Sequence, residues 1–301
     1  MFILWVPVLV AGVVVAALAS RRAVNAALET VDALGMSEGF VGITVLAIGT
    51  DLPEIANSIM ASLTDHGDVN VGDSTGSALT QVTMILAILI VVAGLSSDFK
   101  RDELQIVVPA GLMSVGALVL LAVLLADEHL SRWNGLTMVG AWVLSILVLH
   151  RRTQASHEAP RIPDGRVGGA ILATLFWLLI VGGAAVAIVR SFVEITDAVG
   201  VPEFIASTIV LAIGTSVPEL VVDWVAIKRG AAALALGDLF GATLIDSTLS
   251  VGSGPIFRGT AVSPETLTGV LLIAVGIGAT TVIVATVRRR SLVSAGQHHE
   301  R

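Results

Sequence analysis

The sequence predicts an all-α integral membrane protein with two similar halves, and three observations support this fold class. Of the 301 residues 55% are hydrophobic and only 14% are charged, with a mean hydropathy of +0.91. A soluble domain usually carries about a quarter charged residues. Apolar runs long enough to cross ~30 Å of hydrocarbon as helix recur along the chain. A long stretch of the first half also repeats in the second.

Nine transmembrane helices are expected, with boundaries that hydropathy places to within a few residues. The first run is treated as a retained span because no basic region precedes it and no clean cleavage site follows. The chain has no cysteine, which excludes disulfides, thiolate metal sites and cysteine nucleophiles. The expected spans are 2–19, 40–63, 70–94, 104–126, 133–149, 167–191, 203–227, 231–253 and 265–287.

The distribution of basic residues predicts the orientation of these spans. Of the 17 Lys and Arg residues, nine spans leave only Arg132, Arg190 and Arg258 on one side and the other fourteen on the opposite side. Cytoplasmic loops carry the excess of Lys and Arg. The N-terminus is therefore expected outside and the C-terminus in the cytoplasm of a prokaryotic cell, with the protein in its plasma membrane.

The longest loop divides the chain near its middle. Pro160, Pro163 and Gly165 give it the composition of a linker. Residues 1–149 then form an N-terminal half with spans 1–5, 150–166 a cytoplasmic linker, and 167–301 a C-terminal half with spans 6–9 and a short tail.

The two halves share an internal repeat. Positions 29–83 align with positions 194–248 without a gap, giving 19 identities in 55 pairs. Matches between apolar helices occur by chance, but paired Gly, Thr, Pro and Glu at fixed spacing do not. Five spans separate the starts of the two copies, so they are expected to run in opposite directions. Inverted repeats of this kind are typical of secondary transporters with a site near the bilayer midplane.

The best-matched block contains a helix break. Gly49-Thr50-Asp51-Leu52-Pro53-Glu54 begins about ten residues into span 2, and its counterpart lies in span 7. Proline removes one backbone donor and collides with the preceding turn, so helices 2 and 7 are expected to be discontinuous. Carbonyl groups near Ala47 to Thr50 then lose helical partners, which lipid does not tolerate unless they line a cavity or bind a ligand.

The polar residues around both breaks are oxygen donors. Thr50 and Glu54 lie in the first copy, and Thr215, Ser216 and Glu219 in the second. Carboxylate, hydroxyl and carbonyl oxygens together suit hard cations, and Ca²⁺ accepts about 6–8 of them. No basic residue lies inside the core spans to pair with either glutamate. The sequence therefore predicts one buried cation site.

The next spans supply further candidates. Ser77 and Gln81 in span 3 are four residues apart and share a helix face, and Asp246 in span 8 occupies the repeat position of Gln81. Asp73 and Asp238 are expected to cap or stabilise the starts of spans 3 and 8. A role as cation ligands is the alternative for both. Asp223 lies one turn beyond Glu219 and has two alternative roles. It is either a second carboxylate along the ion path or a group that faces a water-filled vestibule.

These motifs resemble the α-repeats of the cation/Ca²⁺ exchanger superfamily, particularly its prokaryotic Na⁺/Ca²⁺ exchanger branch. The family motif Gly-Thr-Ser-x-Pro-Glu matches closely at Gly49 to Glu54 and Gly214 to Glu219. By position, the resemblance implies metal ligands at Ala47, Thr50, Asp51, Glu54, Ser77, Gln81, Ala212, Thr215, Ser216, Glu219 and Asp246. Three positions depart from the family: Asp51 replaces serine, Gln81 replaces asparagine and Ala242 replaces serine. Family members also usually have ten helices.

The resemblance implies a secondary transporter and not an enzyme, one that exchanges Ca²⁺ for Na⁺ by rocking of spans 1 and 6 past a fixed site. Asp51 and Ala242 keep a proton-coupled antiporter of Ca²⁺ or another divalent cation open as the alternative. The implied partners are the lipid bilayer and inorganic cations, with no cofactor and no nucleic acid, and a monomer is a plausible unit. An aspartyl protease is disfavoured because the chain lacks tyrosine, and a channel because two acids suit a carrier better than fast conduction.

Overall fold

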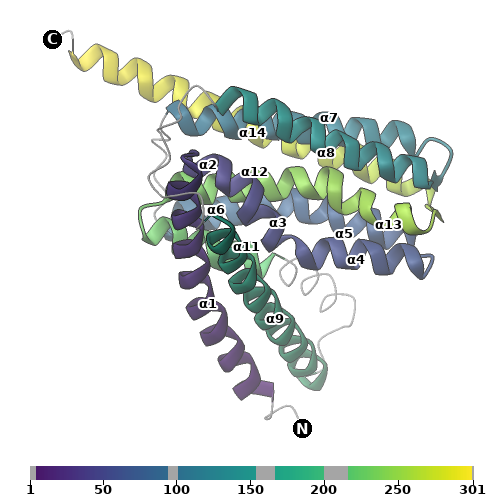
Figure 1. Ribbon diagram of the computed structural model, residues 1–301. Helices are drawn as coiled ribbons and strands as arrows, with labels where there is room; N and C mark the ends of the chain where they lie inside the picture. The colour runs from purple at the N-terminus through teal and green to yellow at the C-terminus, as the bar shows by residue number, and fades with distance from the viewer. Residues whose placement is uncertain (1–4, 94–100, 154–166, 200–215, 300–301) are drawn as a thin grey trace.

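The computed structural model describes residues 5–93, 101–153, 167–199 and 216–299, which are mostly helical (Figure 1). Two short strands, β1 (His129–Leu130) and β2 (Thr260–Ala261), pair antiparallel. The α-helices are α1 (Trp5–Leu34), α2 (Glu38–Val41), α3 (Ala47–Thr50), α4 (Leu52–Leu63), α5 (Gly67–Thr80), α6 (Leu86–Ile88), α7 (Arg101–Leu124), α8 (Arg132–Thr153), α9 (Val167–Val199), α11 (Val217–Lys228), α12 (Ala232–Ile245), α13 (Val251–Phe257) and α14 (Pro264–His299). Four π-helical segments lie between them, at Gly42–Leu46, Gln81–Ile85, Leu89–Ala93 and Asp246–Ser250.

Among the described residues, seven helices are long and apolar enough to cross a membrane, and an eighth span results if the bent pair Glu38–Thr50 and Leu52–Leu63 counts as one. These elements coincide with eight of the nine expected spans. The expected span 203–227 begins in residues outside the described part of the chain, and only its end is seen, as α11. The expected linker 150–166 also falls largely outside the description, but its first residues continue α8 to Thr153.

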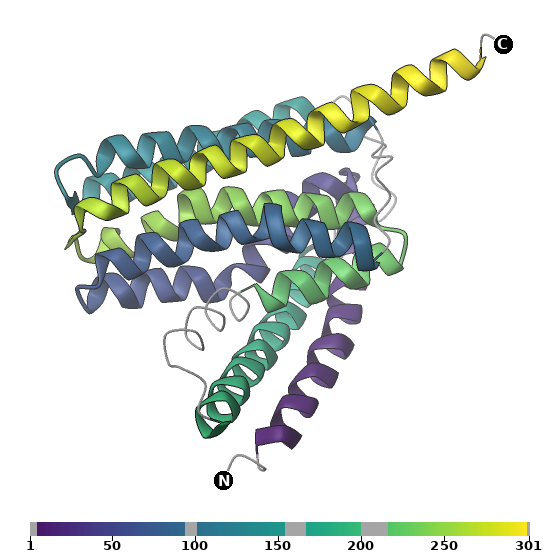
Figure 2. The same ribbon diagram turned by 180° about the vertical axis from the view of Figure 1, so that it is seen from behind.

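The first helix is longer than its apolar run suggested. The expected span ended at residue 19, whereas α1 continues to Leu34 and carries Arg22 on the helix itself. The guanidinium of Arg22 lies 4.8 Å from the ring centroid of Trp177 in α9, in a cation–π contact. α1 and α9 pack along each other and slant away from the remaining helices (Figures 1 and 2).

The centre of the molecule is α12, which packs against α2, α3, α5, α7 and α11. Glycines allow this approach, because a Cβ on Gly237 would lie 2.3 Å from the carbonyl oxygen of Gly39 and one on Gly42 would lie 2.3 Å from that of Leu234. Each clash is with backbone and cannot be relieved by a side-chain rotation. The broken second span is therefore held directly against α12.

The repeat in the sequence is accompanied by a repeat of element boundaries. α4 and α11 begin at equivalent positions of the two copies and end at equivalent positions, and so do α5 and α12. The π-helical segments that start at Gln81 and Asp246 correspond in the same way. Even the turns correspond, since Asp65 (φ 66°) and Gly230 (φ 80°) both adopt the left-handed conformation. Equivalent sequence positions therefore occupy equivalent local structures.

Candidate cation site

The site begins at the break in the second span. α3 ends at Thr50 and α4 begins at Leu52, and the chain bends by 48° between the helical stretch Glu38–Thr50 and α4. Because Pro53 has no N–H, it cannot donate to the carbonyl of Gly49 one turn earlier. The expectation for Ala47 was wrong in one respect: its carbonyl keeps a helical partner and accepts a 3.0 Å hydrogen bond from the N–H of Asp51.

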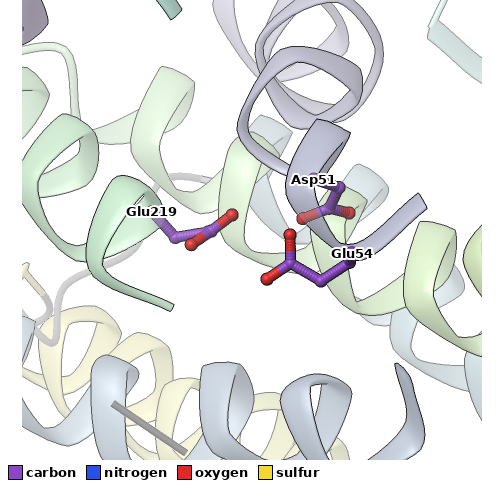
Figure 3. A group of neighbouring side chains, drawn as sticks. All are labelled: Asp51, Glu54 and Glu219. Carbon is purple, nitrogen blue, oxygen red and sulfur yellow. The ribbon is translucent and has the colours of Figure 1, made fainter. Parts of the chain in front are cut away.

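Three carboxylates meet at this break. One oxygen from each of Asp51, Glu54 and Glu219 can be chosen so that all three lie within 4.8 Å of one another. Asp51 and Glu54 come from the end of α3 and the first turn of α4, and Glu219 comes from the first turn of α11 (Figure 3). Figure 3 shows the Glu219 carboxylate facing the other two across the gap between the helices. The glutamates at equivalent positions of the two copies thus converge on one point.

All three side chains are fully buried, and none of their carboxylate oxygens has a hydrogen-bond partner within the described ranges. No described Arg or Lys forms an ion pair with them either, whereas Arg258 pairs with Asp65 at 3.2 Å, away from this site. A charge at bilayer depth costs at least about 2.5–3.5 kcal/mol. Uncompensated, three such charges would repel strongly, so this arrangement requires bound cations or protons.

A hydrogen-bonded group of polar side chains lies alongside. Gln81 Nε2 donates to Asp246 Oδ2 at 3.1 Å, and the hydroxyl of Thr243 donates to Gln81 Oε1 at 3.2 Å. Ser77 Oγ lies 3.5 Å from Gln81 Nε2, at the limit of a hydrogen bond. Asp246 Oδ1 is buried without a described partner. This group therefore offers one further free carboxylate oxygen.

Two of the remaining candidates, Ala47 and Ser216, are among the described residues. Ser216 is buried directly before α11, and its hydroxyl has no described partner. Ala47 packs with Ala242, whose methyl group stands where a serine was expected from the family motif. Ala212 and Thr215 lie outside the described residues.

Asp73 and Asp238 were expected at helix starts, and that expectation was wrong. α5 and α12 begin at Gly67 and Ala232, so both aspartates lie in the second helical turn, too deep to cap. Asp73 is half-buried and accepts a hydrogen bond from Asn57. Asp238 is fully buried, and its Oδ1 accepts a 3.3 Å hydrogen bond from the hydroxyl of Thr50. Asp223 is fully buried.

Comparison with known proteins gives consistent matches over almost the whole chain. The family model described as sodium/calcium exchanger protein matches residues 4–150 and 169–296. The inner membrane protein YrbG of Escherichia coli (strain K12) is 29% identical over 259 residues, which cover 81% of this chain and 77% of YrbG. The sodium/calcium exchanger MaX1 of Methanosarcina acetivorans is 25% identical over 297 residues, covering 86% of this chain and 85% of MaX1.

The fold also has a solved counterpart. A structure of the sodium-calcium exchanger NCX_Mj superposes with a TM-score of 0.75 at 20% sequence identity, covering 97% of this chain and 96% of the other. The putative antiporter CaxA of Alkalimonas amylolytica is 26% identical over 235 residues, which cover 74% of this chain and 71% of CaxA.

Proposed function

This chain belongs to the sodium/calcium exchanger family, and from that premise we propose that it is a secondary antiporter exchanging Ca²⁺ for Na⁺ across a prokaryotic plasma membrane. The observation that carries the proposal is the convergence of Asp51, Glu54 and Glu219, all buried and all without a described partner. Carboxylates arranged in this way bind hard cations in place of water.

The physical basis for exchange is the cost of the empty site. Three carboxylates without cations would carry their full charge through any conformational change, and each charge is expensive at bilayer depth. A carrier whose site holds either Ca²⁺ or Na⁺ avoids that cost. Net movement without a return ion is therefore disfavoured, which favours an exchanger over a channel.

The proposed ion site comprises the two broken segments and the two spans that follow them. Its ligands are Ala47, Thr50, Asp51, Glu54, Ser77, Gln81, Ala212, Thr215, Ser216, Glu219 and Asp246. Element boundaries that match between the two copies of the repeat support two halves, 1–149 and 167–301, joined by a linker. We place the halves in opposite orientations with nine spans, the N-terminus outside and the C-terminus in the cytoplasm.

The test is Ca²⁺ uptake by purified protein in proteoliposomes with an outward Na⁺ gradient. Wild-type protein should accumulate radioactive Ca²⁺, and dissipating the Na⁺ gradient should abolish accumulation. Glu54→Gln and Glu219→Gln should each abolish uptake, because an amide supplies one neutral oxygen in place of a carboxylate. Glu265→Gln, at the exposed start of α14, is the matched control and should transport normally. Normal uptake by either buried-site variant would defeat the site assignment.

Proton coupling is the second candidate, and one local feature favours it. Asp51 adds a third carboxylate beside the two glutamates, while Ala242 contributes no hydroxyl oxygen. An added acid is a group that can carry a proton in exchange for a divalent cation. Uptake of Ca²⁺ driven by a pH gradient in Na⁺-free medium would select this mode, and uptake only with Na⁺ would exclude it.

A further inference from the structure

Two buried acids lie outside the three-carboxylate cluster. Asp223 in α11 and Asp238 in α12 are both fully buried, and these helices pack against each other. The two carboxyl groups are close enough to share a hydrogen bond if one of them held a proton. Within the described ranges, both oxygens of Asp223 and Oδ2 of Asp238 have no hydrogen-bond partner. The pair therefore lacks any described group that compensates its charge.

In the first copy of the repeat, the side chains at the equivalent positions have hydrogen-bond partners within the protein. The counterparts of Asp223 and Asp238 are Ser58 and Asp73. The hydroxyl of Ser58 accepts a 3.1 Å hydrogen bond from the N–H of Gly254, and half-buried Asp73 accepts one from Asn57. Val222 stands at the position equivalent to Asn57 and cannot donate. The unpartnered acid pair is therefore specific to the second copy, and the local helix geometry does not depend on it.

Thr50 connects the pair to the central cluster. Its hydroxyl lies 3.3 Å from Asp238 Oδ1, 3.1 Å from the carbonyl oxygen of Ala47 and 3.3 Å from that of Leu46. A hydroxyl has one hydrogen, so it cannot satisfy all three acceptors at once. When it donates to either carbonyl, its lone pairs face the carboxylate of Asp238. Two carboxylates and a hydroxyl oxygen then surround one point, a donor set that suits a hard cation.

We propose that Asp223, Asp238 and the hydroxyl of Thr50 form a second cation subsite, which binds a dehydrated Na⁺ or Ca²⁺ ion beside the central site. The inference rests on the proposed function, because it requires that cations reach the protein interior. One Ca²⁺ among Asp51, Glu54 and Glu219 leaves this neighbouring pair uncompensated, and a second cation removes that charge. Since Thr50 is shared, occupancy of one site changes the oxygen available to the other.

Equilibrium binding of radioactive Ca²⁺ and, separately, Na⁺ to the purified full-length protein tests the proposal. Asp223→Asn and Asp238→Asn should each lose about one equivalent of one of the two ions while the central site still binds Ca²⁺. The ion that is lost identifies the occupant. Asp73→Asn is the matched control, at the position equivalent to Asp238, and should bind as many ions as wild type.

The outcomes separate this inference from the proposed function. Unchanged amounts of both ions in Asp223→Asn and Asp238→Asn would overturn the subsite and show that the pair holds a shared proton instead. Wild-type protein that binds neither ion would defeat the proposed function itself. If an asparagine variant fails to give a monodisperse protein, Asp223→Ser replaces it, because serine is the residue that the first copy accommodates at the equivalent position. The Asp223→Ser variant should lose the same one equivalent of bound ion.

Discussion

Gln81 donates a 3.1 Å hydrogen bond to Asp246, its own counterpart in the second copy of the repeat. Both side chains are fully buried, and each begins a π-helical segment. An amide and a carboxylate can form this bond without a bound ion, whereas two carboxylates could not. The asymmetry between the copies therefore stabilises one wall of the site when no cation is present.

Gln81→Glu should make the protein depend on a bound cation for stability. The new carboxylate would face Asp246 at hydrogen-bonding distance and add a charge that costs about 2.5–3.5 kcal/mol at bilayer depth. The melting temperature in detergent with a chelator should fall below that of wild type, and Ca²⁺ should raise it by more than in wild type. Thr83→Val, on an exposed face of the same segment, is the control. Equal melting temperatures with chelator would contradict the contact.

Asp51→Ser should have opposite effects on stability and on Ca²⁺ binding. Both oxygens of Asp51 are buried without described partners and lie beside Glu54 and Glu219. Removing one of three like charges should raise the melting temperature with chelator. It should also weaken Ca²⁺ binding in isothermal titration by tenfold or more, since about 1.4 kcal/mol of lost attraction suffices for tenfold. An unchanged Ca²⁺ affinity would place Asp51 outside the coordination shell.

The broken helix and the converging glutamates could be predicted from sequence because proline and a charged residue deep in an apolar span leave few structural alternatives. Pro53 was sufficient to predict the helix break, and Glu54 was sufficient to predict the first buried carboxylate. The presence of most spans was predictable because hydrocarbon thickness fixes the length of an apolar run. The helix ends were less predictable, since α1, α9 and α14 continue beyond the expected spans. The start of α5 was placed too late because Asp68 and Asn70 lower the local hydropathy, although the helix begins at Gly67.

The roles of Asp223 and Asp238 were not predictable from hydropathy alone. Asp238 was expected at a helix start. The expected span began at position 231, however, so the sequence already placed Asp238 well inside the helix and could have indicated that it is buried there. Its contact with Thr50 joins segments far apart in the sequence and depends on how closely α12 approaches α3. The π-helical segments at Gln81 and Asp246 have no recognisable sequence pattern, so the orientation of those side chains could not be derived.

The close packing of α12 should be sensitive to a single methyl group. In Gly237→Ala the new Cβ would lie 2.3 Å from the carbonyl oxygen of Gly39, and overpacking of this kind costs about 1–3 kcal/mol. Gly72→Ala, the equivalent change in α5, meets nothing within 4 Å and should be neutral or slightly stabilising. Thermal melts of the two variants give the comparison. A Gly237→Ala protein as stable as Gly72→Ala would show that α2 and α12 are not in contact in the membrane protein.

Removal of Ca²⁺ should destabilise the wild-type protein, because the cation compensates carboxylates that no described side chain compensates. A ligand that binds only the folded state at a hundredfold excess over its dissociation constant adds about 2.7 kcal/mol. The melting temperature should therefore rise with Ca²⁺ concentration and return to its starting value on chelation. In the double variant Glu54→Gln with Glu219→Gln, Ca²⁺ should raise the melting temperature by clearly less than in wild type, whereas Glu265→Gln should follow the wild type. A double variant that Ca²⁺ still stabilises as strongly as wild type would show that the ion binds elsewhere, because two amides cannot replace the charge of the carboxylates that face each other at the break.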